Sequence, residues 1–283
     1  MAIQSPDLLY PSSAPGDAGT VEYQELLPAV VAAVKAAGRH IQDRFSFDSR
    51  PMSREELGSA LAANDAASLE LLRPALVKAR PSAGWIEDEE EGGSLPSGEY
   101  WVTDPVEGNI NHIHGMTEWG VTATLVRDNI PVLTAAYLPM GDNIYTSVRG
   151  GGAYLDGVRL RTSLKTDLRA ALVGTGQAKP GEAIEIYRQI GQSVTAMLQG
   201  ALLVRVSVPV TLLLLQLASG RMDVFWQYGQ VRVGLLPGAL LVEEAGGTIT
   251  DIQGQPWTTA SKAFLATAPG LHAAAVKTLS GVS

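Results

Sequence analysis

The stretch that decides how this chain is interpreted covers residues 101–115 and reads Trp-Val-Thr-Asp-Pro-Val-Glu-Gly-Asn-Ile-Asn-His-Ile-His-Gly. It begins as an apolar strand and turns at Asp104-Pro105 and Glu107-Gly108, where proline fixes one φ angle and glycine permits a tight turn. Two carboxylates three residues apart at the end of a strand can point into one pocket. Such a pair suits either a hard cation with oxygen ligands or acid–base catalysis, and both interpretations stay open at this point.

A second acidic cluster lies just upstream of this turn. It reads Glu87-Asp88-Glu89-Glu90-Glu91 and ends at Gly92-Gly93. Most of these acids are expected to be solvated loop charges. One or two of them are expected to face the same pocket as Asp104.

The composition indicates a large globular domain. The chain has 283 residues, of which 46% are hydrophobic, so it can bury a full core. Charged residues make up 18%, below the usual quarter, and the net charge is -8, which argues against a nucleic-acid partner. Because the chain has no cysteine, disulfides, thiolate catalysis and zinc–thiolate sites are excluded.

The hydropathy pattern predicts a soluble, cytoplasmic protein without a membrane partner. The longest apolar run, residues 208–218, is interrupted by Thr211 and Gln216 and is too short to span a bilayer. The N-terminus lacks the basic region and apolar stretch of a secretory signal.

Residue periodicity predicts a mobile N-terminal arm over residues 1–20 and a single domain over 21–283. The domain divides into an N-terminal half of about 21–165 and a C-terminal half of about 166–283. Helices are expected at 21–45, 55–79, 181–196, 209–218, 235–245 and 271–279. Strands are expected at 84–86, 100–103, 120–127, 131–138, 143–148, 153–155, 171–174, 202–206, 223–226, 248–251 and 263–266. This mixture predicts an α/β protein of layered sheets and helices, with an antiparallel meander in its first half.

Several ordered motifs resemble the inositol monophosphatase superfamily, whose signature has the form Asp-Pro-x-Asp-Gly-Thr-x-Asn-Phe-x-His-Gly. Residues 104–115 of this chain follow that form, and the turns at 150–157, 218–223 and 243–251 are also similar to the family. The resemblance covers about residues 21–280. It implies the family's αβαβα five-layer sandwich and, commonly, a homodimer.

The resemblance also implies a chemistry. Family members are usually Mg²⁺-dependent phosphomonoesterases in which carboxylates bind two or three ions. Carried over, the ligands would be an upstream pair, placed at Asp88 and Glu89, followed by Asp104 and by Glu107 in place of the second aspartate. The threonine that helps to position the attacking water is replaced by Asn109.

Other family positions have changed more. The late Trp-Asp pair reads Val233-Gly234, the acid before it is Gln227, and the Gly-Ser-Ala segment reads Val208-Pro209-Val210. The Thr-x-x-Asp segment is matched to residues 61–64 and ends in asparagine, although Asp65 is adjacent. These changes fall on metal and phosphate positions. They predict that a full multi-ion site is lost, with Asp88, Glu89, Asp104 and Glu107 as residual candidate ligands.

Without metal, two neighbouring carboxylates repel, so one is expected to hold a proton at a raised pKa. Glu107 and Asp104 are therefore the candidate acid–base pair. His112 is a candidate proton shuttle, or an aromatic-sized packing residue with one hydrogen bond. Asn109 is expected to assist by orienting the substrate.

Five residues are candidate substrate contacts: Asn111, Gln227, Gly234, Trp226 and Tyr228. All of them except Gly234 have a structural alternative. Asn111 could stabilise the turn, Gln227 could line a wall, and the two aromatic residues could belong to the core.

The first functional hypothesis is a metal-independent acid–base enzyme on a phosphatase scaffold. It would cyclise, isomerise or dehydrate a small molecule in a specialised biosynthetic pathway, with no cofactor or at most one weakly bound Mg²⁺. The second hypothesis is a divergent Mg²⁺-dependent phosphomonoesterase acting on an inositol or sugar phosphate. The third is a non-catalytic pseudoenzyme that binds a ligand in the old cleft.

Overall fold

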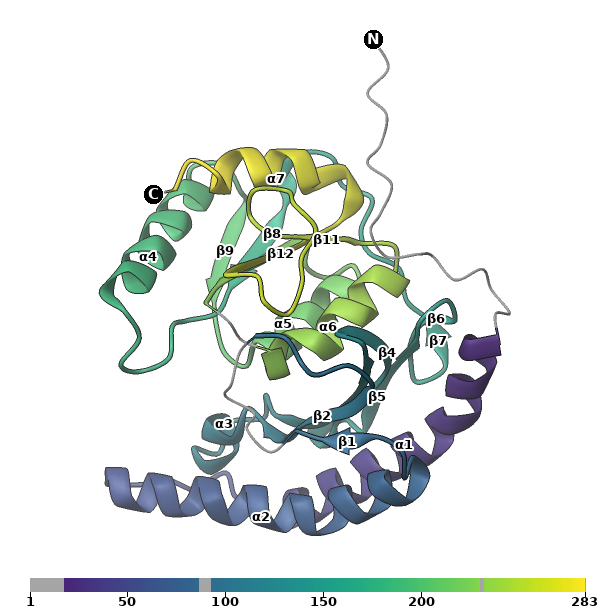
Figure 1. Ribbon diagram of the computed structural model, residues 1–283. Helices are drawn as coiled ribbons and strands as arrows, with labels where there is room; N and C mark the ends of the chain where they lie inside the picture. Colours follow the sequence, from purple (N-terminus) through teal and green to yellow (C-terminus); the bar gives the residue numbers. More distant parts are fainter. Residues whose placement is uncertain (1–17, 87–92, 230–231, 283) are drawn as a thin grey trace.

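The computed structural model describes residues 18–86, 93–229 and 232–282, and these form five layers in the order α, β, α, β, α (Figure 1). The first layer holds α1 (Ala18–Gln42) and α2 (Arg54–Ala79). The middle layer holds α5 (Val210–Ala218) and α6 (Arg232–Glu244), and the last holds α4 (Ile184–Leu198) and α7 (His272–Leu279). The expected αβαβα sandwich is confirmed.

The first sheet has seven strands in chain order, and all neighbouring pairs except β1–β2 are antiparallel. Its strands are β1 (Gly84–Trp85), β2 (Glu99–Glu107), β3 (Gly120–Arg127), β4 (Ile130–Leu138), β5 (Asn143–Val148), β6 (Gly152–Leu155) and β7 (Val158–Arg159). The expected meander is therefore present. The strand expected at 100–103 is longer than predicted, because β2 continues through Glu107.

The second sheet has five strands in the order β11-β12-β10-β8-β9. Its strands are β8 (Leu172–Thr175), β9 (Leu203–Val206), β10 (Val224–Tyr228), β11 (Thr248–Thr250) and β12 (Ala263–Thr267). The pairs β8–β9 and β8–β10 are parallel, and the pairs with β12 are antiparallel.

The short elements lie at turns. Three 3-10 turns were not predicted: η1 (Pro139–Gly141), η2 (Leu168–Ala170) and η3 (Pro269–Leu271). The short helix α3 (Asn109–Ile113), which follows β2 directly, was not predicted either.

The central helices α5 and α6 pack against each other and between the two sheets. A helix that is buried along most of its surface needs little polar face, and α5 reads Val-Thr-Leu-Leu-Leu-Leu-Gln-Leu-Ala, with only Leu212 and Gln216 partly exposed. The two helices approach closely at Gly238, where a Cβ atom would collide with the side chain of Leu214. This pair of helices forms the wall against which the end of β2 lies.

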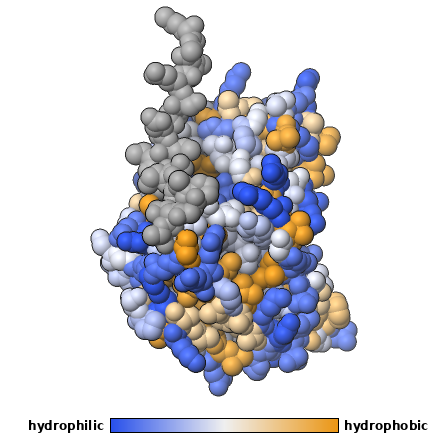
Figure 2. Space-filling model, turned by 90° about the vertical axis from the view of Figure 1, so that its right-hand side faces the viewer, coloured by the Kyte–Doolittle hydropathy of each residue, from blue (hydrophilic) through white to orange (hydrophobic). Residues whose placement is uncertain are grey.

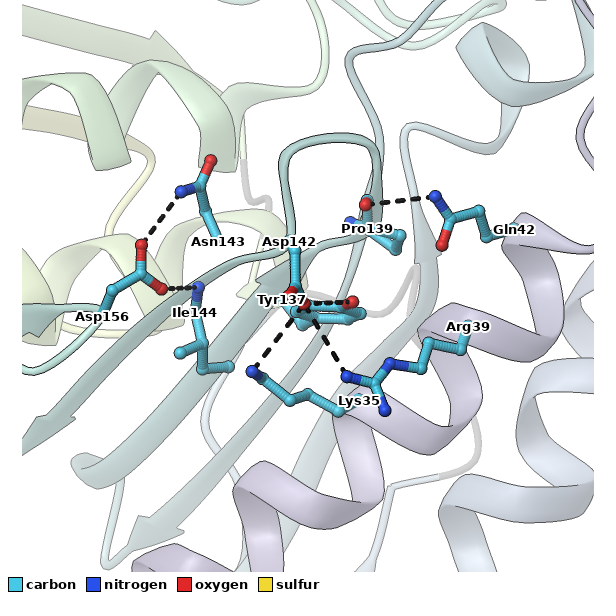
Figure 3. Close-up of polar contacts among 9 residues, drawn as sticks. All are labelled: Lys35, Arg39, Gln42, Tyr137, Pro139, Asp142, Asn143, Ile144 and Asp156. Carbon is cyan, nitrogen blue, oxygen red and sulfur yellow. Dashed lines mark hydrogen bonds and ion pairs between the residues drawn. The ribbon is translucent and has the colours of Figure 1, made fainter.

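The helix α1 lies across the β4–β5 hairpin and is held there by polar contacts at one end of the hairpin (Figure 3). The Tyr137 hydroxyl donates to Asp142 Oδ1 at 2.8 Å, and Lys35 and Arg39 of α1 approach the same carboxylate. The Gln42 amide donates to the Pro139 carbonyl at 3.2 Å. These contacts fix the helix over the outer face of the first sheet, opposite the α5–α6 layer.

Part of the expected N-terminal arm over residues 1–20 lies outside the described residues, which begin at 18. The remainder is helical, because α1 begins at Ala18 rather than after residue 20. Within the described ranges, no helix is both long and apolar enough to cross a membrane. The face in Figure 2 mixes hydrophilic areas with smaller hydrophobic ones.

Candidate active site

The candidate site forms where β2 ends. The pairing of β2 with β3 shifts between Asp104 and Glu107, so the strand bulges at these residues. Gly108 follows with φ 79°, in the left-handed region, and opens α3. A side chain at this position would also meet the Glu118 carbonyl oxygen and Pro209. The turn therefore requires glycine. Glu107, just before it, points toward α5.

The bulge brings the two carboxyl groups together. Asp104 is half-buried, its Oδ1 accepts a hydrogen bond from the Val106 amide at 3.1 Å, and Glu107 is 4% exposed. The side chains of Glu107 and Asp104 are hydrogen-bonded to each other. Burial raises the pKa of Glu107 to about 7. A raised pKa was expected for one acid of the pair, but its main cause is burial and not repulsion between two charges.

Thr211 of α5 connects this pair to α6. Its hydroxyl lies 2.5 Å from Glu107 Oε2 and 2.8 Å from the Gly234 carbonyl oxygen. A carbonyl only accepts, and a hydroxyl has one proton to donate. When Thr211 donates to Gly234, the proton between Thr211 and Glu107 comes from Glu107. The geometry therefore suits a protonated Glu107 in the metal-free site.

Asp65, which the sequence showed only as the acid adjacent to Asn64, contacts the candidate site residue Asn109. Its Oδ1 accepts from Asn109 Nδ2 at 2.8 Å, and the second Nδ2 proton goes to the Leu61 carbonyl at 3.1 Å. Burial raises the pKa of Asp65, while the bond from Asn109 opposes this shift. The match of the Thr-x-x-Asp segment to residues 61–64 ends at Asn64, whereas the acid that contacts Asn109 is Asp65, one residue further on. The helical phase of α2 could have signalled this, since it places both Asn64 and Asp65 toward Asn109.

The structure does not support His112 as a proton shuttle. The ring is 3% exposed, its Nδ1 lies 3.0 Å from Asn64 Nδ2, and its Nε2 lies 3.0 Å from the Ile41 carbonyl. It also packs edge-on against Trp119 and Phe45. Burial lowers the pKa of His112. With both nitrogens engaged, this histidine is a neutral packing residue, which was the structural alternative.

Two of the expected substrate contacts are held by the backbone. Asn111 Nδ2 donates to the carbonyls of Glu118 and Val208, so this side chain ties the turn to the segment before α5. Gln227 is 1% exposed, its Oε1 accepts from the Gly176 amide, and its Nε2 donates to the Tyr228 carbonyl. The structure gives both residues a positioning role.

Trp226 and Tyr228 do not line the site, which corrects the expectation that they contact the substrate. Successive side chains of a strand point to opposite faces, so both residues face away from Gln227. Trp226 is fully buried, and its Nε1 donates to Ser193 Oγ of α4 at 2.8 Å. They belong to the core between the second sheet and α4 and α7.

The donor set fits Mg²⁺. Among the described residues, no three or more histidine, aspartate or glutamate side chains cluster as a metal site. Asp88 and Glu89, the expected upstream ligands, lie outside the described residues. Asp104 and Glu107 nevertheless supply two converging carboxylates. Mg²⁺ commonly binds through one or two carboxylates, keeps several waters and takes further oxygens from a substrate phosphate.

The fold and the site define a class: a five-layered α/β protein with a carboxylate pair at a bulge beside its central helices. The sequence model of the inositol monophosphatase family matches residues 22–282 of this chain. The chain belongs to the inositol monophosphatase family.

Curated relatives and solved structures agree with this assignment. The inositol-1-monophosphatase of Rhizobium meliloti is 30% identical over 237 residues, which cover 81% of this chain and 86% of the relative. The Nus factor SuhB of Pseudomonas aeruginosa is 30% identical over 242 residues, covering 82% and 87%. The inositol monophosphatase structure from Anabaena superposes with a TM-score of 0.75 at 24% identity, covering 92% of this chain and 97% of that one.

Two expectations are overturned by these comparisons. The hypothesis of lost phosphatase chemistry and a metal-independent cyclase, isomerase or dehydratase is wrong, because the chain matches a phosphatase family over most of its length. The expectation of no cofactor, or at most one weakly bound Mg²⁺, is wrong for the same reason, since this family is Mg²⁺-dependent. The expected small-molecule substrate fits the family. The absence of a nucleic-acid partner, the homodimer and the cytoplasmic location stay predictions.

Proposed function

We propose that this protein is a Mg²⁺-dependent phosphomonoesterase whose substrate is a small-molecule phosphate, with an inositol monophosphate as the first candidate. The observation that carries the proposal is the meeting of the Asp104 and Glu107 carboxyl groups at the β2 bulge, in a chain of this family. The names of the relatives support inositol monophosphate as the first substrate to test.

In this proposal Asp104 and Glu107 would hold the metal ion. When bound, Mg²⁺ neutralises phosphate charge and lowers the pKa of coordinated water. Glu107 must give up its proton to become a ligand, and Thr211 then donates to the resulting carboxylate. The hydrogen bond between Thr211 and Glu107 therefore changes direction with the protonation state of Glu107: the hydroxyl accepts from the protonated acid and donates to the carboxylate.

Asn109 and Asp65 act beside the metal ligands. Asn109 donates to one oxygen of Asp65 and so fixes the orientation of the carboxylate. The other oxygen is left to accept a proton from the water that attacks the phosphate. Burial, which raises the pKa of Asp65, makes this carboxylate a better proton acceptor.

The test is phosphate release from inositol monophosphate and a panel of sugar phosphates by the purified protein. We expect turnover with Mg²⁺, none in excess chelator, and a loss of at least ~100-fold in kcat/KM for Asp104→Asn, because a metal ligand is removed. The matched control is Glu70→Gln, an exposed acid on α2, which should keep full activity. Mg²⁺-independent turnover, or full activity in Asp104→Asn, would exclude the proposal.

We also propose that the protein forms a homodimer. β9 is an edge of the second sheet, and its neighbourhood carries exposed apolar side chains on Leu202, Leu203 and Val206. An exposed edge strand with apolar side chains can pair with another chain, and exposed apolar patches mark sites of protein–protein contact. Light scattering coupled to size exclusion should give twice the chain mass of 29.8 kDa. A monomer at micromolar concentration would contradict this.

A further inference from the structure

A second cavity lies behind the candidate active site. It has a volume of about 360 Å³ and lies between the 43–53 loop, α2 and α3. It is lined by Arg44, Ser46, Ser49, Ala60, Asn64, His112 and Ile113. Neither Asp104, Glu107, Asp65 nor Asn109 lines it, so the cavity is distinct from the phosphatase site.

The polar lining of this cavity offers hydrogen-bond donors. Arg44 is exposed, and its Nε donates to Asn64 Oδ1 at 3.1 Å, which leaves the two terminal guanidinium nitrogens to reach the cavity. Ser46 Oγ accepts from the Asp48 amide and keeps its own proton to donate. Ser49 adds a second hydroxyl, and none of the seven lining residues is acidic. A lining with one cationic side chain, two hydroxyl donors and no carboxylate suits the binding of an oxyanion.

A directed chain of hydrogen bonds joins the cavity to the active site. Arg44 donates to the Asn64 carbonyl oxygen, and the Asn64 amide donates to Asn109 Oδ1 at 2.9 Å and to His112 Nδ1 at 3.0 Å. Asn109 in turn donates to Asp65. Asn64 uses both of its amide protons in this chain, so its orientation is fixed from both sides.

We propose that this cavity binds a small oxyanion, such as inorganic phosphate or a carboxylate, on Arg44, Ser46 and Ser49. The bound anion holds the Arg44 guanidinium, and the Arg44–Asn64 bond passes that restraint to Asn109. By linkage, anion binding in the cavity restrains the Asn109 side chain, and anything that restrains the Asn109 side chain changes the affinity of the cavity for the anion. The inference does not depend on the proposed phosphatase activity.

The test is titration of the full-length protein with inorganic phosphate by calorimetry in excess chelator. Without metal the two active-site carboxyl groups attract no anion, so binding reports the second cavity. We expect saturable binding to the wild type and at least ~10-fold weaker binding to Arg44→Met, which removes a charge-assisted contact. Arg39→Met is the matched control, since it removes an exposed arginine of α1 that pairs with Asp142, and it should bind as the wild type does.

Two further measurements keep the proposal falsifiable. Ser49→Ala retains the Arg44–Asn64 bond, so it should fold normally and still weaken phosphate binding by a few fold. A parallel titration with acetate separates a tetrahedral anion from a carboxylate as the preferred ligand, and either one supports the site. No saturable binding of either anion, or equal binding to wild type and Arg44→Met, would overturn it.

The connection to the active site has its own readout. In nitrogen-15 spectra recorded in chelator, phosphate should move the side-chain amide signals of Asn109, which does not line the cavity. The same addition should leave those signals unchanged in Arg44→Met. Binding in the wild type without any change at Asn109 would refute the connection.

Discussion

At the scale of single residues, the site depends on how each polar group is paired. Glu107 is buried against Thr211, Asn109 is held between Asn64 and Asp65, and His112 has no nitrogen left for catalysis. The acids at 104 and 107 could be identified from their spacing alone. The role of His112 could not, because its two partners come from α1 and α2, far away in the sequence.

The raised pKa of Glu107 predicts a pH-dependent stability of the metal-free protein. The pKa rises from its ordinary 4.5 to about 7, so the folded state holds the proton longer than the unfolded state does. The contribution of Glu107 to the free energy of unfolding is therefore greatest below pH 4.5. It falls as the pH rises toward 7, by at most about 3 kcal/mol. Urea unfolding in chelator at a series of pH values measures this.

The control for this prediction is Glu107→Gln, which has no proton to lose. Its free energy of unfolding should fall less than that of the wild type over the same pH interval. Parallel pH profiles for the two proteins would show that Glu107 is not the group that titrates.

Asn64 is predicted to contribute more to stability than any exposed residue of α2. Asn64→Ala leaves the Asn109 oxygen and the His112 Nδ1 without a donor, and each buried acceptor left unpaired costs about 1–3 kcal/mol. We expect a loss of roughly 2–4 kcal/mol in urea unfolding. Ser59→Ala, an exposed change on the same helix, should stay within ~0.5 kcal/mol of the wild type. Equal effects of the two substitutions would contradict the network.

At the scale of elements, periodicity located most helices and strands to within a few residues, and the exceptions share a cause. β2 extends to Glu107 and α3 follows at once, because Gly108 reverses the chain there and β3 supplies the pairing. Side chains alternate between the two faces along β10, so Gln227 lies on the opposite face from Trp226 and Tyr228. The three residues therefore cannot all contact one substrate.

The start of α2 gives a prediction at this scale. Ser53 is its N-cap, and its side chain accepts from the Glu56 amide at 3.1 Å. Ser53→Ala removes the acceptor and should cost about 1 kcal/mol in thermal or urea unfolding. Ser53→Gly should cost only a few tenths, since glycine exposes the same amides to water. A larger loss for glycine than for alanine would argue against capping.

At the scale of the whole molecule, two sheets are joined through the α5–α6 layer, and further contacts reach across the halves. Arg149 pairs with Glu243 at 2.9 Å, and Glu244 accepts from the amides of Gly150 and Gly152. These contacts attach the β5–β6 turn to the end of α6.

The close packing of α5 on α6 predicts opposite effects for two glycine substitutions. Gly238→Ala would drive a methyl group into Leu214, so it should destabilise the fold by about 1–3 kcal/mol despite the better helix propensity of alanine. Gly191→Ala in α4 meets no neighbouring atom and should stabilise by up to about 1 kcal/mol. Urea unfolding measures both, and stabilisation by Gly238→Ala would show that the helices can separate without cost.

The sequence by itself determined the family resemblance, the layered α/β class and the acidic turn at Asp104 and Glu107, because these depend on local spacing, periodicity and turn-forming residues. Only the tertiary structure decided that Asp65 is the acid beside Asn109, that His112 is a packing residue, and that a second cavity lies behind Asn64. Those features arise where α1, α2 and α3 meet. Contacts between distant segments depend on packing geometry, which the order of residues along one segment does not contain.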